Sequence, residues 1–180
     1  MIFLSLGTHE QPFSRAIELV EPIAQAGEEV VVQHGSTPPQ AGMAGVRWLP
    51  YLDYGGMVDT MVGARGFVCH AGVGSIMTAL RHAVTPVVVP REARLDEHVD
   101  DHQRQLSDRL AQLGLIVVAD ERGLEPALES AAALRGASRG PGVQLSMAIE
   151  RASDRRGRLL PARPRWFRPA VDQDRRRTSR

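Results

Sequence analysis

Short apolar runs bounded by turn residues alternate along the chain with segments whose apolar residues recur every three or four positions. The runs cover residues 2–6, 30–33, 46–49, 66–69, 86–89 and 115–118. Runs of this length are typical of buried strands, and their alternation with helix-period segments is typical of a parallel sheet covered by helices. The pattern predicts an α/β protein with a doubly wound, Rossmann-like parallel sheet of about six strands.

Helix-period segments follow five of the six runs. They are expected to form helices over residues 15–26, 53–64, 74–83 (with Ser75 as the alternative start), 98–113 and 124–134. Ser14 is the expected N-cap of the first helix, and Pro22 inside it predicts a kink. The fourth has the clearest period, and Gly114 is placed to end it. Its apolar stripe consists of Val99, Leu106, Leu110 and Leu113.

The composition changes after residue 136. With 180 residues, 43% apolar and 24% charged, the chain is expected to form one soluble domain. We assign that domain to residues 1–136. Residues 137–154 are expected to be a linker with room for one short helix, and the Arg- and Pro-rich residues 155–180 are predicted to be a disordered tail.

Charge is divided between the two ends of the chain. Residues 151–180 hold 11 arginines against three acidic residues, a net of +8, whereas residues 1–150 hold 11 arginines against 18 acidic residues, a net of −7. The tail also contains Trp166 and Phe167. It could contact anionic lipid, bind nucleic acid without specificity or only keep the protein soluble, and we favour the last. No specific nucleic-acid partner is expected.

Several protein classes are excluded by what the chain lacks. All 22 basic residues are arginine, which excludes a lysine Schiff base and the P-loop, since both need lysine. Cys69 is the single cysteine, so no internal disulfide can form and a reduced, cytoplasmic setting is expected. No apolar run reaches the roughly 18 to 20 residues of a membrane span, and the start of the chain lacks the pattern of a signal peptide.

Polar residues gather after the predicted strands. Five of the six histidines are in these segments: His9, His34, His70, His98 and His102. In an open parallel sheet, ligands bind outside the carboxyl ends of the strands. A ligand site at this edge is therefore expected, although each histidine taken alone could simply be a solvated loop residue.

The segment HAGVGS enters a helix directly after a strand. Gly72 and Gly74 allow close approach of the backbone, and the free amides of a first helical turn favour an anion such as diphosphate. Gly7 and Thr8 form a similar loop after the first strand, so two loops could present amides to one anion. The dinucleotide fingerprint is not met, because its third glycine would be Met77.

Gln103 belongs to the apolar stripe of the fourth helix, near its start. Its amide is therefore expected to face a pocket at the ligand edge, and the alternative is a buried glutamine bonded to the backbone. His98, Asp101 and His102 could together suit zinc, which leaves open a metal-dependent hydrolase. We predict no metal, since spacing defines no further ligand and solvation of this acidic turn explains the residues as well.

Three motifs in order resemble a known family. The segments MIFLSLGTHEQPF, VCHAGVGSIMTALR and TPVVVPR followed by EHVDDHQ closely resemble the C-terminal-domain group of glycosyltransferase family 28. The resemblance covers about residues 1–136. Within the group it is closest to short stand-alone donor-binding subunits, such as the soluble subunit of the dolichol-pathway UDP-GlcNAc transferase and bacterial exopolysaccharide subunits.

The resemblance implies one half of a GT-B enzyme, the C-terminal half that holds a UDP-sugar, without a cofactor. The missing half implies a membrane-associated partner subunit that binds a polyprenyl-diphosphate-linked acceptor, in exopolysaccharide or glycolipid synthesis. The expected activity is inverting transfer of a hexose, and the expected location is cytoplasmic, at the inner face of the plasma membrane through the partner. The alternative is a non-catalytic, nucleotide-binding regulatory module.

The family's site residues can be carried over to matching positions. The resemblance places these residues at the nucleotide and its phosphates: Gly7, Thr8, His70, Gly72, Gly74 and Ser75. It places Asp101, His102 and Gln103 in the motif whose glutamine faces the donor sugar. Arg91 would offer a charge to the diphosphate, with a solvent-exposed loop cation as the alternative. We expect the catalytic base on the partner subunit, with His9 as the local candidate.

Three positions depart from the family pattern. Thr78 stands where many relatives carry a glutamate that binds ribose hydroxyls, so that contact is in doubt. Ala83 replaces a glycine common in the turn before the fifth strand, and Asp96 replaces the glycine of a Gly-Glu-His. Both replacements should stiffen or distort their loops, the second only modestly, because aspartate tolerates positive φ better than most residues.

Overall fold

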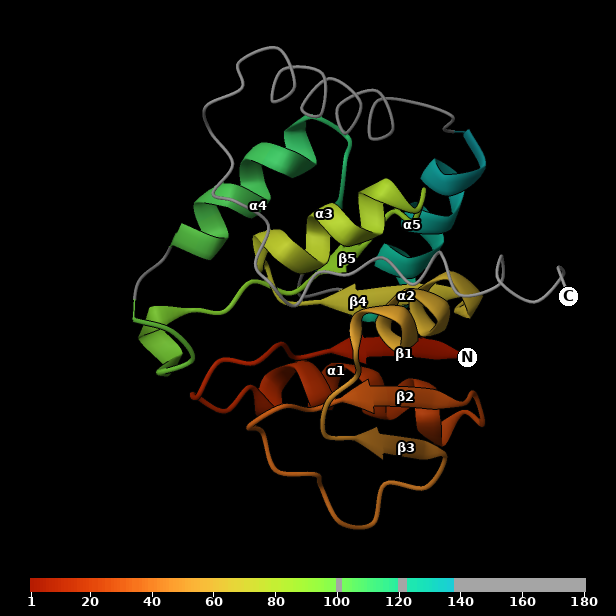
Figure 1. The fold of residues 1–180 in the computed structure, drawn as a ribbon, viewed down its shortest axis with the longest axis vertical. Helices are drawn as coiled ribbons and strands as arrows, with labels where there is room; N and C mark the ends of the chain where they lie inside the picture. The colour runs from red at the N-terminus through yellow and green to blue at the C-terminus, as the bar shows by residue number, and fades with distance from the viewer. Residues whose placement is uncertain (100–101, 120–122, 138–180) are drawn as a thin grey trace, which may run out of the picture. The chain divides into compact units, whose positions relative to one another are not determined.

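Six parallel strands form one sheet, as predicted, in the computed structural model, which describes residues 1–99, 102–119 and 123–137. The strands are β1 (Ile2–Ser5), β2 (Val30–Gln33), β3 (Val46–Leu49), β4 (Gly66–Cys69), β5 (Val87–Val88) and β6 (Val117–Val118). Their order across the sheet is β3-β2-β1-β4-β5-β6. Figure 1 labels the strands of this order from β3 to β5. This is the order of a doubly wound sheet, which confirms the predicted fold class.

The winding direction reverses between β1 and β4. The chain builds outward from β1 through β2 to β3, then crosses to β4 on the other side of β1. Ser5 therefore pairs with Gln33 of β2 and with Cys69 of β4. The segments after β1 and β4 are thus brought together, although more than 60 residues separate them, and the crevice between them is where such folds bind ligands.

Helices cover both faces of the sheet. The side chains of β1 alternate, so Ile2 and Leu4 enter the apolar core shared with α1 (Ser14–Gln25) and α5 (Leu124–Ala137). Phe3 enters the core on the opposite face. That core is shared with α2 (Tyr54–Gly63), α3 (Val73–Arg81) and α4 (His102–Gln112). In the part of the chain that the structure describes, no helix is long and apolar enough to cross a membrane.

Cys69 ends β4 in the middle of the sheet and is fully buried. Burial raises the pKa of its thiol, because the thiolate would lose its hydration. The thiol is therefore unreactive in the folded protein.

The starts of α1 and α3 differ slightly from the predicted ones. Ser14 is the first residue of α1 rather than its N-cap; that place is taken by Phe13, whose N–H donates to the Thr37 hydroxyl at 3.1 Å. The helix continues through Pro22 to Gln25. α3 begins at Val73, one residue before Gly74 and two before Ser75, the two predicted starts, with Gly72 as N-cap.

The predicted start of the fourth helix is wrong. α4 begins at His102, because the loop after β5 is held in an irregular form that includes the short 3₁₀ helix η1 (Ala93–Leu95). Val99 is consequently 78% exposed instead of buried, and Leu113 is 55% exposed at the other end. Gly114 follows with φ +67°, as expected of a helix-ending glycine.

β5 and β6 contain two residues each, where four were predicted. Pro86 and Pro90 flank β5 and have no N–H to donate, which limits its length. The predicted linker and tail, residues 138–180, lie outside the described residues and stay predictions.

Candidate functional site

A pocket of about 450 Å³ lies at the carboxyl ends of β1 and β4. It is lined by Thr8, His9, Glu10, His70 and Gln103. These residues come from three segments: the loop after β1, the loop after β4 and the first turn of α4. The structure therefore joins three of the regions that the sequence singled out. Glu10 was not among the predicted residues, and its position next to His9 is the only signal that could have indicated it.

The His70 ring packs against two glycines of the site. A Cβ atom at Gly7 would lie 2.5 Å from Cε1 of His70, and one at Gly72 would lie 2.2 Å from its Nε2. Gly7 also has φ +78°, a conformation that side chains disfavour. Both positions need glycine to make room for the imidazole, a reason that the sequence pattern did not provide.

His70 is neutral at physiological pH. Burial, reinforced by the positive charge of Arg91, lowers its pKa to about 4. Its Nδ1 is buried and has no hydrogen-bond partner among the described residues. A neutral imidazole has one N–H donor, so His70 can donate to an anion without bringing a full charge into the site.

The N-terminus of α3 is open at the same edge. Its N-cap is Gly72, which has no side chain to bond the first-turn amides of Val73, Gly74 and Ser75. Val73 is 61% exposed and Gly74 is also exposed. Free amides at the positive end of a helix dipole suit an anion, as predicted for this loop.

Gln103 connects two loops and also borders the pocket. Its Oε1 accepts the backbone N–H groups of Ala71 and Arg91, both at 3.2 Å. Since both partners are donors, the oxygen must face them and Nε2 must point elsewhere. The sequence left two alternatives for Gln103, a side chain facing a pocket and a side chain bonded to the backbone. Both describe it in part, because the oxygen is bonded to backbone while the side chain still lines the pocket.

Arg91 does not lie where either expectation put it. A solvent-exposed loop cation is wrong, because the residue is only 1% exposed. A charge offered to the pocket is not what the structure shows either, because both terminal nitrogens donate to carbonyl oxygens of the protein. The guanidinium carbon also lies 4.5 Å from the centre of the Phe13 ring.

Glu97 is a buried carboxylate that sequence reasoning missed. Its Oε1 accepts from Nε of Arg15 at 2.9 Å and its Oε2 from Nη2 at 2.7 Å, while Oε2 also accepts the Glu92 N–H at 3.0 Å. Arg15 is on α1, 82 positions earlier in the chain. No local pattern links residues so far apart, so only the fold reveals that this pair holds the loop after β5.

The zinc alternative receives no support from the described residues, in which no three His, Cys, Asp or Glu side chains gather as metal ligands would. The rings of His9 and His98 do lie close, with centroids 4.9 Å apart. Asp101 and the side chain of His102 fall outside the described part of the chain. Their assignment to the site stays a prediction.

The three departures from the family pattern have visible effects. Ala83 and Asp96 are the two non-glycine residues with positive φ in the described ranges, at 56° and 55°. Both were singled out as glycine replacements, and both take the conformation that glycine would. The Thr78 hydroxyl donates to the Gly74 carbonyl at 2.8 Å, one turn back in its own helix.

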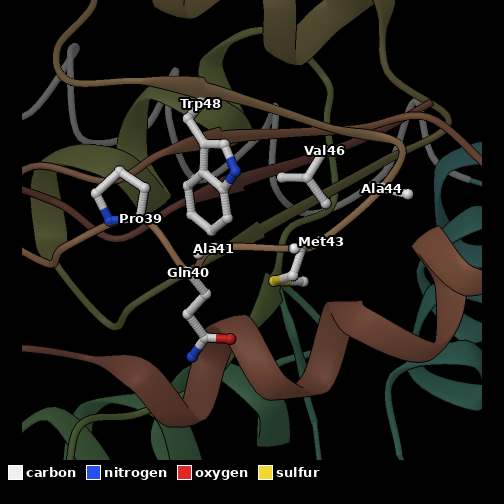
Figure 2. A pocket seen from close by; sticks show the side chains of 8 residues that line it. Pro39, Gln40, Ala41, Met43, Ala44, Val46 and Trp48 are labelled. Carbon is white, nitrogen blue, oxygen red and sulfur yellow. The ribbon is translucent and has the colours of Figure 1, made fainter.

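A second pocket, of about 600 Å³, lies beside the edge strand β3. Figure 2 shows Val46 and Trp48 of the strand across from Pro39 and Met43 of the preceding loop. Its lining contains no ionisable side chain. Of these two pockets, the one between β1 and β4 is therefore the better candidate for chemistry.

The fold and the pocket place the chain among doubly wound α/β proteins that bind ligands at the switch point of the sheet. Comparison with known proteins makes this more specific. The sequence profile of the glycosyltransferase family 28 C-terminal domain matches residues 1–131. The chain belongs to this family.

Two similar relatives are UDP-N-acetylglucosamine transferase subunit ALG13 from two strains of Cryptococcus neoformans var. neoformans serotype D. Each is 42% identical over 60 residues. The match covers 32% of this chain and 28% of the relative, so it spans less than a third of either.

A similar solved structure is the glycotransferase of kitacinnamycin, with a TM-score of 0.51 and 21% identity. The match covers 83% of this chain and 42% of that chain, so this chain corresponds to less than half of that protein. The likeness supports the fold, which is that of one half of a GT-B glycosyltransferase.

Proposed function

We propose that this chain is the donor-binding component of a two-component inverting glycosyltransferase and holds a UDP-sugar at the carboxyl ends of β1 and β4. One observation carries the proposal: the loops after β1 and β4 and Gln103 line one pocket in a family 28 domain, and the second of these loops leads directly into the open N-terminus of α3. The relatives described as UDP-N-acetylglucosamine transferase subunits support a uridine donor and a subunit role.

In the proposed reaction, an acceptor hydroxyl attacks the anomeric carbon of the donor sugar. The bond between that carbon and the diphosphate oxygen breaks, and the configuration of the carbon is inverted. Negative charge grows on the departing UDP. The free amides and dipole of α3 stabilise that charge, and the N–H of neutral His70 adds a donor. Nε2 of Gln103 offers its hydrogens to the hydroxyls of the sugar.

The acceptor side belongs to a second subunit in this proposal. Large apolar side chains are exposed in the segments at the carboxyl ends of the strands, namely Tyr51, Tyr54, Val73, Leu95 and Val99. Apolar groups gathered at one edge are typical of a surface that another protein covers. We propose a membrane-associated partner at the inner face of the plasma membrane, with a polyprenyl-diphosphate-linked acceptor of exopolysaccharide or glycolipid synthesis.

The catalytic base then belongs to that partner, which positions the attacking hydroxyl. His9 is the candidate within this chain, because it lines the pocket. Asp101 and His102 complete the proposed donor site with Gln103.

A non-catalytic, nucleotide-binding module is the second candidate. The Thr78 hydroxyl is bonded within its own helix, so the ribose contact made by the glutamate of many relatives has no equivalent at this position. A module of this kind would bind the nucleotide without distinguishing the sugar.

Calorimetric titration of the purified chain, with and without EDTA, tests the proposal against UDP, a panel of UDP-sugars, and GDP and NAD as controls. Tighter binding of one UDP-sugar than of UDP supports the donor role and identifies the sugar. Equal affinity for UDP and every UDP-sugar favours the regulatory module. If neither the isolated chain nor a co-purified complex binds uridine nucleotides, both candidates are wrong.

Two substitutions of Gln103 separate its two tasks. Gln103→Ala removes the loop clamp and the Nε2 donor, whereas Gln103→Glu keeps an oxygen for the amides of Ala71 and Arg91 and removes only the donor. Because an added charge repels the diphosphate of both ligands, the readout is the ratio of the Kd for UDP to the Kd for the UDP-sugar. We expect each variant to lower that ratio about five- to ten-fold, the effect of about one hydrogen bond.

Gln105→Ala is the matched control, since Gln105 is exposed on the same helix. It should leave the ratio unchanged. An unchanged ratio in both Gln103 variants would remove this residue from the sugar pocket.

A further inference from the structure

The Arg91 side chain joins the loops that follow β1 and β5. Nη1 donates to the Gln11 carbonyl at 2.8 Å and to the Glu97 carbonyl at 3.0 Å, and Nη2 donates to the Leu6 carbonyl at 3.1 Å. Leu6 and Gln11 bracket the segment that contributes Thr8, His9 and Glu10 to the pocket. A single guanidinium therefore holds both ends of that segment and attaches them to Glu97.

The backbone of Arg91 extends the same connection to the loop after β4. Its N–H donates to Oε1 of Gln103, which also accepts the N–H of Ala71. Arg91 is thus linked to every segment that lines the pocket. Its side chain reaches the first loop and its main chain reaches the second through Gln103.

Folding stability alone does not explain this arrangement. Among the described residues, the Arg91 guanidinium donates to backbone carbonyl oxygens. The nearby Glu97 carboxylate is hydrogen-bonded to Arg15 instead. Three buried polar atoms, Gln11 Oε1, His70 Nδ1 and Arg91 Nε, have no partner there. Burying a charge without a carboxylate and with incomplete hydrogen bonding is unfavourable compared with a well-packed apolar side chain.

We propose that Arg91 is a positioning residue of the donor site, whose buried guanidinium holds the loops after β1 and β5 at the separation that the ligand requires. The proposal rests on the proposed function insofar as the ligand is a UDP-sugar. Arg91 acts through the loop backbone, and no contact between its side chain and the ligand is needed.

The charge of Arg91 has a second effect, which can be measured without any ligand. Burial lowers the pKa of His70, as do Arg91 and the rings of His9 and His98, whereas the nearby backbone of Ser5 raises it. Arg91 is the group among these that acts through a permanent positive charge. Removing its charge should therefore raise the pKa of His70 from about 4 toward its ordinary value of 6.5.

The test compares Arg91→Met, Arg91→Lys and the control Arg94→Met in the full chain. Arg94 is 72% exposed in the same loop, where it pairs with Glu92. Three quantities are measured: the Kd for UDP, the pKa of His70 from its Cε1–H resonance, and hydrogen exchange of the Ala71 and Arg91 amides. Circular dichroism establishes that each variant is folded.

We expect Arg91→Met to weaken UDP binding about ten-fold or more, to raise the pKa of His70 and to speed exchange of both amides. Arg91→Lys should keep the pKa of His70 low, because it keeps the charge, yet still weaken UDP binding, because an ammonium cannot reproduce the planar fork. Arg94→Met should change none of the three. If Arg91→Met does not fold, Arg91→Lys carries the test through affinity and amide exchange.

A lower thermal midpoint with unchanged UDP affinity in the folded variants would overturn the proposal and leave Arg91 a structural residue only. If neither the unmodified chain nor a co-purified complex binds UDP, it is the proposed function that fails. The positioning role is then judged by amide exchange and by the His70 titration, and unchanged values in Arg91→Met overturn it.

Discussion

His70 shows how strongly single residues determine the geometry of this site. Its ring fills the space that side chains at Gly7 and Gly72 would need. In that enclosure the imidazole loses hydration, which lowers its pKa to about 4 and keeps it uncharged. The glycines thus set both the position and the protonation state of the histidine.

Gly72→Ala should weaken UDP binding about ten-fold, because the new Cβ must displace the His70 ring. Removing the ring by His70→Ala should relieve the clash. A double-mutant cycle in UDP affinity is therefore expected to give a coupling of about 1 kcal/mol or more. Gly63→Ala is the control, since nothing lies within 4 Å of the added Cβ on α2. Additive effects of the two substitutions would show that the clash is not what requires glycine at this position.

Ala83→Gly should stabilise the protein. The φ of Ala83 is 56°, a region that costs about 1–2 kcal/mol for a residue with a Cβ, while glycine gives back about 0.4–1 kcal/mol through the entropy of the unfolded chain. The net gain of about 0.5–1 kcal/mol should raise Tm by about 2–4 °C. Ala133→Gly, on the exposed side of α5, should lower Tm instead. Equal shifts at both positions would contradict this account.

Features that depend on neighbours in the sequence could be predicted at this scale. Helix phase predicted the place of Gln103 at the pocket. The family resemblance identified Ala83 and Asp96 as replacements of glycine, and both have positive φ in the structure. The burial of Arg91 and the Arg15–Glu97 pair could not be predicted. Their partners are up to 85 residues away in the chain, so only the folded backbone brings them together.

At the scale of elements, apolar pattern located all six strands but not the lengths of the last two. β2, β3 and β4 match their predicted ranges, because turn residues mark their ends clearly. The start of α4 was predicted four residues too early, since Val99 continued the apolar period while the loop before the helix was already held by Arg91 and Glu97. Periodicity carries no information about such tertiary bonds.

Ion pairs of Arg65 connect segments at the amino ends of β2 and β4. Arg65, just before β4, donates from Nε and Nη2 to the Glu28 carboxylate at 3.0 and 2.6 Å, and also pairs with Glu125 of α5. Hydrogen bonding from Arg65 is the main reason that the pKa of Glu28 is lowered from 4.5 to about 2. The Arg65–Glu28 ion pair connects the segment before β4 to the segment before β2, at the edge of the sheet opposite the pocket.

Glu28→Gln should therefore destabilise the protein in a pH-dependent way. A lowered pKa in the folded state contributes stability above the unfolded pKa, and this contribution is lost as pH falls from about 4.5 to about 2. Because both side chains are partly exposed, the difference at pH 7 should be about 1 kcal/mol or less. Urea unfolding of both proteins between pH 2 and 7 measures it. Glu29→Gln, at a carboxylate that is 59% exposed, is the control. A difference that grows as pH falls would contradict the assignment.

For the whole molecule, the sequence pattern indicated the fold class and the edge at which ligands bind. It did so because a doubly wound sheet follows from alternating buried strands and helices, and its switch point follows from strand order. The pocket walls were less accessible to prediction, since they come from segments that long-range hydrogen bonds of Arg91 and Gln103 join. The exposed apolar edge could not be predicted either, because the stripe containing Val99 was expected to face inward.

The single cysteine, Cys69, provides a natural probe of local opening in the folded protein. The Cys69 thiol is buried in the core that the sheet shares with α2 and α3, so a thiol reagent can reach it only when that core opens. Reaction with an aromatic disulfide should be slow in native buffer and immediate in urea. Added UDP should slow it further if the nucleotide binds across β1 and β4. The rate of colour release would then report, without any label or engineered probe, how far a ligand suppresses opening of the core around Cys69.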